Sequence, residues 1–462
     1  MKAKWSRGRA ILLVMLLIAT TYHWHPGWGW NSETRLALIK AVVHGQTLSI
    51  NKYHFETHDK AEYPPNSGNY FCDKPVGGQI LGLLGYSVAW HVAGLVTPDL
   101  DRRDAAAVGG ARWMAVAAPS IVMAIWMAGF LGVLGCSPRQ AFFLTLAYSL
   151  GTLAWPYATI YFGHQATASL GMLAFMSSTC AVRGFRKRTT FAFFGGLLAS
   201  WAAIIDVPGL MVLGLLFLYV LSGGLRIAVP FLVGIIPPAL LQLAYNWACF
   251  ESPFRFGYMY EAHPSFANPE GWLGLPRLEP LWGITFSPEK GLFALSPFLL
   301  FAIWGLWIMV RDSEWRREGL VCAAIVVSFL IFNAGYYMWD GGVCFGPRHL
   351  VPMLPFLGVG LAFAWRGLLK RPWRWLCVLL AGWSAVVMLL ASFMVSEPAY
   401  QGLSDLGNPL REAVLRTMTE TEYPKFGVLP GLPLWLSILI EAMVLGCLAL
   451  WLYRITRPEV RS

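Results

Sequence analysis

The sequence predicts an all-α polytopic membrane protein, and three observations lead to this prediction. Of the 462 residues, 56% are hydrophobic and only 13% are charged, whereas about a quarter of a soluble globular protein is charged. The chain also contains about a dozen apolar runs of roughly 17–25 residues, each long enough to cross a bilayer. Between them no stretch is long enough for a soluble domain of normal size. Because every backbone polar group must be hydrogen-bonded inside lipid, the runs are expected to form a bundle of about 12–13 transmembrane helices.

The positions of the basic residues predict which ends of the helices face the cytoplasm. A net charge of +10 would suggest a nucleic-acid partner in a soluble protein, but here the cations lie in short loops beside apolar runs. This is the positive-inside pattern, so no nucleic-acid partner is expected. The segments assigned to the cytoplasmic side are 1–9, 183–188, 311–317, 366–374 and 454–461.

From this sidedness, residues 1–462 are predicted to form a single integral membrane domain with three long loops on the outer face. These loops are 23–75, 247–291 and 395–430. Because both termini are basic, the number of spans must be even, yet thirteen apolar runs are present. One run between residues 76 and 134 is therefore expected to be re-entrant or broken, unless a terminus is misplaced.

The first outer loop is expected to begin with a helix over residues 32–44 that lies in the membrane interface. Apolar residues recur on one face at helical spacing, and Arg35 takes another position. Glu33 falls in the first turn of this helix. It can serve as a partner of the helix dipole or as a general base at the membrane surface.

Two acid–base pairs follow in the same loop, Asp59-Lys60 and Asp73-Lys74. As solvated surface pairs they would contribute little to stability. As functional residues, Lys60 and Lys74 could neutralise a phosphate as point charges. The carboxylates of Asp59 and Asp73 could bind a divalent cation or a sugar hydroxyl.

A second polar segment is MWDGGVCFGPRHL over residues 338–350. Its glycines predict a close approach of the backbone to a ligand or a neighbour. Arg348 can extend to a lipid headgroup or bind a phosphate with its guanidinium fork. Asp340 and His349 are further candidates in this segment.

Two more polar residues interrupt apolar sequence. His164 lies between two apolar runs on the outer side, where a histidine is either structural or functional, and we retain it as a candidate. Asp206, in AAIIDVPGL, is either an intramembrane carboxylate or part of a turn between two spans, and the turn is favoured.

Several common catalytic motifs are absent from the sequence. There is no Walker A motif, no HExxH and no GxSxG with partner residues, so nucleotide hydrolysis and zinc chemistry have no support. No metal site is assigned. The cofactor is unknown, with a divalent cation at the loop carboxylates as one option.

Five motifs, taken in order, resemble a known family. They are YxxDKxxG, GTxxxPYAxxxFGH, YNxxxFxSPFxxGY, FSPxKGLFxxxP and WDGGxxFGPRHLxPxLPFL. Together they look like the GT-C superfamily of glycosyltransferases that use polyprenyl-phosphate sugars. Its members include bacterial protein mannosyltransferase-like proteins and the lipid A aminoarabinose transferases. The resemblance covers roughly residues 10–365.

The resemblance implies a GT-C-like bundle and an inverting glycosyltransferase. Glu33 matches the acid of the family's first loop, although relatives often have an aspartate there, so Asp59 is the alternative base. Lys74 matches a basic residue near the donor phosphate. Lys60, in the same loop, is a further candidate phosphate ligand, and Arg348 is a candidate for a second phosphate contact.

The partners implied are a polyprenyl-phosphate sugar donor, membrane lipid and an acceptor that is a glycan, a lipid or a protein. The implied location is the bacterial inner membrane, with the active site facing the periplasm. The alternative is a transporter or flippase of a lipid-linked saccharide, which would hold phosphate with the same cations. Transporters often contain two related halves, and no such internal repeat is visible in this sequence.

Overall fold

The described part of the chain is almost entirely helical. The computed structural model describes residues 2–23, 29–264, 271–342, 344–367, 371–393 and 433–457. The third outer loop expected at 395–430 lies outside these residues.

The helices follow the apolar runs of the sequence. The first half contains α1 (Lys2–Thr21), α2 (Trp30–Gly45), α3 (Gly77–Gly94), α4 (Leu100–Arg112), α5 (Ala118–Val133), α6 (Pro138–Gly151), α7 (Ala154–Ala158), α8 (Gly163–Val182) and α9 (Arg188–Ile205). The second half contains α10 (Gly209–Leu221), α11 (Leu225–Phe250), α12 (Leu278–Thr285), α13 (Leu292–Leu295), α14 (Leu299–Arg311), α15 (Arg316–Gly335), α16 (Leu354–Gly367), α17 (Arg371–Ser392) and α20 (Leu434–Ile455).

A few short elements complete the description. They are the single turns η1 (His54–Glu56), η3 (Gly257–Tyr260) and η4 (Arg348–Met353), the π-helical turn η2 (Trp113–Ala117), and a two-stranded antiparallel ribbon of β1 (Ala61–Glu62) and β2 (Tyr70–Phe71).

The lengths of the helices confirm the predicted all-α polytopic membrane fold. Among the described residues, seven helices are long and apolar enough to cross a membrane, and α10 and α14 are shorter apolar helices. α1 and α8 have 20 residues each. Each apolar run predicted from the sequence coincides with a helix or a helix pair.

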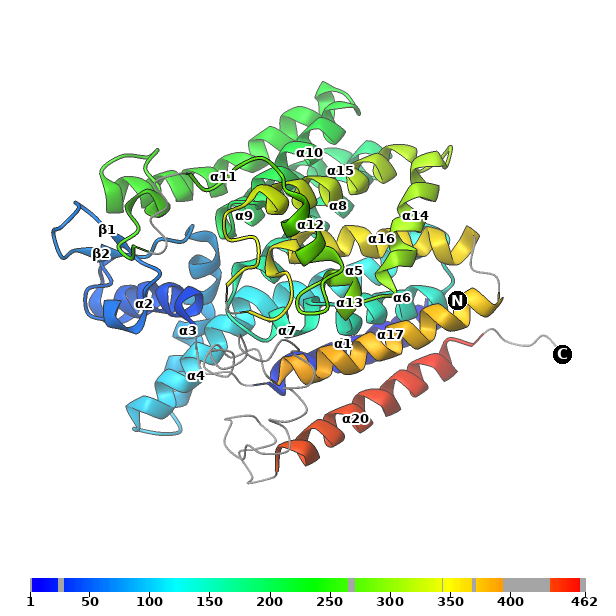
Figure 1. Ribbon diagram of the computed structural model, residues 1–462, viewed down its shortest axis with the longest axis horizontal. Coiled ribbons are helices and arrows are strands. Elements are labelled where there is room, and N and C mark those ends of the chain that lie inside the picture. The colour runs from blue at the N-terminus through cyan, green and yellow to red at the C-terminus, as the bar shows by residue number, and fades with distance from the viewer. Residues whose placement is uncertain are drawn as a thin grey trace.

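The bundle has two chemically different ends (Figure 1). α2, the β ribbon and α4 lie at one end, and the start of α1 and the end of α20 lie at the other. We call these the α2 end and the basic end. At the basic end, the Lys4 ammonium donates to the carbonyl oxygen of Arg457 at 2.9 Å, so the first and last helices meet there.

α3 and α4 lie in the region, residues 76–134, where one apolar run was expected to be re-entrant or broken. Residues Leu100–Val133 form one continuous helix of 34 residues, about 50 Å long at 1.5 Å per residue. Arg112, within this long helix, lies beside the end of α1, because its guanidinium donates to the carbonyls of Thr20 and His23. α3 packs along the part of the helix before Arg112, with Gly85 against Gly110. α3 therefore packs against α4 and against the π-helical turn η2 that follows Arg112.

α2 differs from the interfacial helix expected over residues 32–44. Most of its residues from Ser32 to Ala41 are buried, including Arg35, which is 2% exposed. No side chain caps its start, and Gln46, in the left-handed conformation, follows its end. The prediction of one apolar face was wrong because α3 and the β ribbon loop cover the helix on several sides.

Candidate active site

The polar residues predicted from distant parts of the sequence converge at the α2 end. Four segments meet there: the loop after α2, the start of α8, the junction of α9 and α10, and the segment from Tyr336 to His349. Tyr336 lies within electrostatic range of both Lys74 and Arg348, which are far apart in the sequence. The polar groups form two halves, which we describe in turn.

The first half is centred on Lys74. Its ammonium pairs with the carboxylate of Asp73 and, at 3.0 Å, with that of Asp59. Thr34 of α2 donates to the other oxygen of Asp73 at 3.1 Å. Burial alone would lower the pKa of Lys74, but the two carboxylates outweigh burial and hold this pKa well above its usual value. The lysine is therefore charged and tightly enclosed by anions.

The segment around η3 packs against Asp73 and Lys74 and covers this half of the site. The backbone of Gly257 lies directly against Asp73, with no space for a side chain. The Tyr258 ring lies 4.9 Å from the Lys74 ammonium. Glu261 bridges to Ala61 of β1. Burial, followed by the negative charge of Asp73, raises the pKa of Glu261 far above that of an ordinary glutamate, which favours the protonated form of this carboxyl.

Arg35 connects the two halves. Its guanidinium donates to the side-chain oxygen of Gln79 at 3.2 Å and to the carbonyl of Ile205 at 3.4 Å. Gln79 in turn donates to the thiol of Cys72 at 3.2 Å. The buried arginine thus joins α2 to α3 and to the end of α9, which fixes the position of the Asp73-Lys74 pair.

Two other candidates of this loop are Lys60 and Glu33. The Lys60 ammonium donates to the carbonyl of His54 at 2.7 Å and lies 4.8 Å from the Tyr70 ring. Glu33 is in the first turn of α2 and acts electrostatically on Lys40, whose ammonium pairs with Asp104 at 3.0 Å. Thus Thr34 contacts Asp73 and Arg35 contacts Gln79, whereas Lys60 contacts only neighbouring residues of its own loop among those described.

The second half contains two histidines. His164 at the start of α8 contacts the Asp206 carboxylate through Nδ1 at 2.6 Å, and the His349 ring lies 5.2 Å from the His164 ring. The Nε2 atoms of both histidines are buried without a hydrogen-bond partner among the described residues. Buried polar atoms are rarely left without a partner, so these two nitrogens are suited to a ligand. The turn predicted for Asp206 is confirmed, since α9 ends at Ile205 and α10 begins at Gly209.

Cations gather beside the histidines. Arg348 opens η4, and its guanidinium lies 5.5 Å from the Phe162 ring. Lys290 donates to the carbonyl oxygens of Asp340 and Gly342 at 3.0 Å and 2.6 Å. The same ammonium is 3.8 Å from the Asp340 carboxylate. Gly341 and Gly342 have positive φ, which explains the glycine pair in this turn.

The two halves differ in charge. In the first half, the carboxylates of Asp59 and Asp73 outnumber the ammonium of Lys74. The second half holds two cations, Lys290 and Arg348, and two carboxylates, Asp206 and Asp340, and the guanidinium of Arg35 between the halves adds a further positive charge. An anion is favoured in the second half, and a group that gives up a proton or donates hydrogen bonds is favoured in the first.

Sequence reasoning missed three residues of this site. Glu261 and Tyr258 belong to the aromatic loop after α11, and Lys290 belongs to the FSPEKGLF motif. The motif pattern that includes Lys290 was the available signal. No cluster of three or more metal-ligating side chains occurs in the part of the chain that the structure describes.

Comparisons with known proteins were made for the whole chain. No protein-family model matches it, and no curated protein matches it. Among solved structures, it is similar to ArnT from Cupriavidus metallidurans bound to undecaprenyl phosphate, with 16% identity, a TM-score of 0.49, and coverage of 98% of this chain and 77% of that chain. The apo state of the same ArnT is similar at 17% identity, a TM-score of 0.49, and coverage of 98% and 76%.

A third similar structure is the apo oligosaccharyltransferase of Archaeoglobus fulgidus. It has 11% identity and a TM-score of 0.49, with coverage of 90% of this chain and 58% of that chain. What the site does chemically is argued below from its own residues.

Proposed function

We propose that this protein is an inverting glycosyltransferase that moves a sugar from a polyprenyl-phosphate donor to an acceptor hydroxyl. The observation that carries the proposal is the division of one site into an acidic half around Lys74 and a cationic half around Arg348 and His349. Transfer from a sugar phosphate needs cations at the leaving phosphate and a carboxylate at the acceptor. The two halves supply these groups at one end of an apolar bundle.

The cationic half is assigned to the donor phosphate. The guanidinium of Arg348 can bind two phosphate oxygens in its plane, and Lys290 adds a point charge. The Nε2 atoms of His164 and His349 can complete the hydrogen bonds to these oxygens. The polyprenyl chain would extend from here between the helices.

The acidic half is assigned to the acceptor. Of the two candidate bases, Asp59 is better placed than Glu33 because its carboxylate is 3.0 Å from the Lys74 ammonium at the centre of the cluster. Asp73 is held by Thr34 and Lys74 together, so we assign it to orienting Lys74. Lys74, predicted as a phosphate ligand, is instead assigned to positioning the carboxylates.

The proposed reaction is a single displacement. The acceptor oxygen attacks the anomeric carbon and forms the new glycosidic bond, while its proton passes to the Asp59 carboxylate. The bond between the anomeric carbon and the phosphate oxygen breaks, and the lipid phosphate leaves with the electron pair. Attack opposite the leaving group inverts the configuration, and the cations of the second half stabilise the departing phosphate.

The site is assigned to the outer face of a bacterial inner membrane. The opposite end of the bundle holds the basic segments 183–188 and 311–317, the start of α1 and the end of α20, and the positive-inside rule predicts a cytoplasmic location for them. An enzyme with this orientation would use a lipid-linked sugar, since the donor must be delivered across the membrane. A flippase remains the second candidate, because cations around a phosphate would serve it equally.

The test is transfer by purified protein in detergent, supplied with a labelled polyprenyl-phosphate sugar and an extract of membrane acceptors. Asp59→Asn and Arg348→Gln are expected to lower transfer by at least about 100-fold and about 10-fold, respectively. Lys52→Ala and Asp101→Asn change exposed charges at the same end of the bundle and should retain activity.

Full transfer by Asp59→Asn, with loss in Glu33→Gln, would reassign the base to Glu33. Movement of the lipid across vesicles without cleavage of the sugar would favour the flippase.

A further inference from the structure

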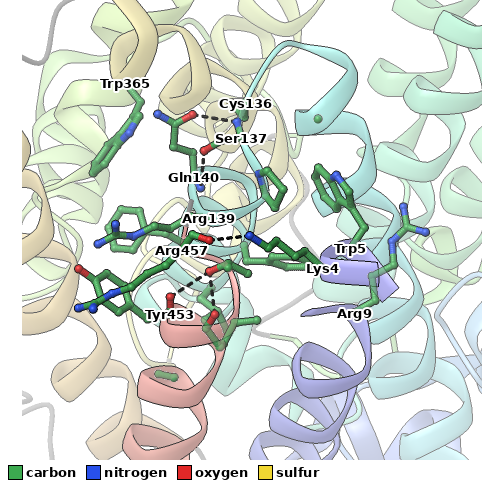
Figure 2. A pocket seen from close by; sticks show the side chains of 18 of the residues that line it. Lys4, Trp5, Arg9, Cys136, Ser137, Arg139, Gln140, Trp365, Tyr453 and Arg457 are labelled. Carbon is green, nitrogen blue, oxygen red and sulfur yellow. Dashed lines mark hydrogen bonds between the residues drawn. The ribbon is translucent and has the colours of Figure 1, made fainter. Parts of the chain in front are cut away.

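A large cavity lies at the basic end, far from the candidate active site. Its volume is about 1620 Å³, which exceeds the roughly 300–1,000 Å³ of a typical small-molecule pocket. Its walls come from the start of α1, the junction of α5 and α6, the ends of α16 and α20, and the start of α17 (Figure 2). None of these segments contributes to the site at the α2 end.

The charged side chains of the cavity wall are all basic among the residues that the structure describes. They are Lys4, Arg9, Arg139, Arg374 and Arg457. α6 also begins in this wall, with Ser137 and Gln140 forming its capping box. The start of a helix carries partial positive charge, which adds to that of the side chains. An anionic group is therefore the ligand that the polar part of this cavity favours.

Several of these arginines are held by aromatic rings. The guanidinium of Arg139 lies 3.7 Å from the centre of the Tyr453 ring, and that of Arg457 lies 5.2 Å from the same ring. The Arg374 guanidinium is 5.9 Å from the Trp365 ring. Contact with a ring positions a guanidinium without neutralising it. The cations are thus ordered around the cavity while their charge is retained.

The positive-inside rule explains why cations occur at this end, but it does not explain why they surround a cavity. Another basic residue of the same end shows the contrast. Arg183 pairs with the buried carboxylate of Glu318 at 2.9 Å and lies against the Trp315 ring at 3.4 Å. Its charge is compensated within the protein, whereas the described wall of the cavity has no carboxylate.

Part of the cavity wall is apolar and lies between α20 and the rest of the bundle. Phe143, Leu146 and Val378 contribute to it. In α20, only 22% of the most apolar stretch is buried. A ligand with both an anionic head and an apolar body would fill the space that separates α20 from α6 and α17.

We propose that this cavity binds an anionic phospholipid of the inner leaflet. The phosphate would lie between Arg139 and Arg457, and the acyl chains would lie along the apolar wall beside α20. Basic pockets between helices on the cytoplasmic side favour such headgroups. The bound lipid connects α20 to the bundle, so it contributes to the stability of the whole protein. This proposal does not depend on the function assigned to the other end.

The test is thermal unfolding of the purified, delipidated full chain in neutral detergent. Phosphatidylglycerol is expected to raise Tm by at least about 3 °C through preferential binding to the folded state, and phosphatidylcholine is not. The double variant Arg139→Gln/Arg457→Gln should fold with near-normal Tm without lipid and lose the response. The matched control Arg186→Gln/Lys187→Gln removes two exposed cations of the same end and should retain it.

Three results would overturn the proposal. An equal response to phosphatidylcholine would show that the headgroup charge is not recognised. An equal response to inorganic phosphate would show that the acyl chains are not bound. An unchanged response in Arg139→Gln/Arg457→Gln would place the lipid elsewhere. Native mass spectrometry of the same samples, counting bound phosphatidylglycerol, keeps the test decisive if a variant unfolds early.

Discussion

At the scale of single residues, Arg348 and Lys74 are both positively charged, but their neighbours suit them to different roles. Lys74 is surrounded by the carboxylates of Asp59 and Asp73, so its charge is satisfied within the protein. Arg348 lies beside the buried, unpartnered Nε2 of His349, next to an aromatic ring. The first arrangement orders a site, and the second is suited to an incoming anion.

Arg348 provides a prediction that separates binding from stability. Because hydrogen bonds to a charged group contribute about 1.5–3 kcal/mol, Arg348→Gln is expected to lower kcat/KM for sugar transfer by about 10–100-fold. The Tm should change by less than about 2 °C. Steady-state kinetics and thermal unfolding in the same detergent check both parts. A large fall in Tm with unchanged kcat/KM would assign Arg348 a structural role.

Glu261 provides a prediction about pH. Its pKa is raised by burial and by Asp73, so the folded protein keeps a proton that the unfolded chain releases above pH 4.5. The folded state then binds more protons than the unfolded state, and stability falls as pH rises through that range. Glu261→Gln should remove this loss and stabilise the protein at pH 8 by at least about 1.4 kcal/mol, the equivalent of one pKa unit.

The measurement for Glu261 is Tm against pH for both proteins, from pH 5 to pH 8. The wild-type curve should fall relative to that of Glu261→Gln as pH increases. Parallel curves would show that the carboxyl is ionised in the folded protein.

At the scale of elements, the sequence was sufficient for the spanning helices but not for those at the α2 end. The apolar runs coincide with helices because inside lipid a helix is the default conformation. The helix predicted over residues 32–44 is confirmed as α2, but the burial of Arg35 by partners on α3 and α9 was not predicted. These partners are far away in the sequence, and periodicity within one segment contains no information about them.

The candidate site shows the same limit. Asp73-Lys74, Arg348 and His349 could be selected because charges in apolar sequence are rare. Glu261 and Tyr258 could not be selected, because a loop rich in aromatics also fits a membrane interface. Only the fold places their loop against Asp73.

The contact between α14 and α16 gives a prediction at this scale. A Cβ atom added at Gly305 would overlap the carbonyl oxygen of Gly360, so Gly305→Ala must separate two helices and is expected to cost about 1–3 kcal/mol. Gly382 of α17 has open space around it, and Gly382→Ala should be neutral or stabilise by up to about 1 kcal/mol. Thermal unfolding of the two variants checks this; equal Tm values would contradict the close packing.

At the scale of the whole molecule, the orientation of the bundle follows from charge counted over the entire chain. No single loop determines it. The end at which α3 and α4 form their hairpin is predicted to face the periplasm, and the basic end is predicted to face the cytoplasm. α3 has the length of a short span, but it is not among the described helices that are apolar enough to cross a membrane.

This orientation can be tested in intact cells. Ser67 is exposed in the loop between the two β strands, and Arg186 is exposed at the basic end. A membrane-impermeant maleimide is expected to label Ser67→Cys when the outer membrane is permeabilised, and to label Arg186→Cys only after the inner membrane is broken. The wild-type chain, whose cysteines are buried or partly buried except Cys447, is the background control. Early labelling of Arg186→Cys would reverse the assigned orientation.

The difference in charge between the two halves of the site has a consequence for which molecules it admits. An acceptor with its own phosphate or carboxylate would approach Asp59 and Asp73 against electrostatic repulsion, at a cost of about 1 kcal/mol or more per charge at contact distance. An acceptor that presents a neutral hydroxyl next to an amine would be attracted to the same carboxylates. Discrimination among acceptors would then depend on their charge before any sugar is recognised, and raising the salt concentration would weaken it.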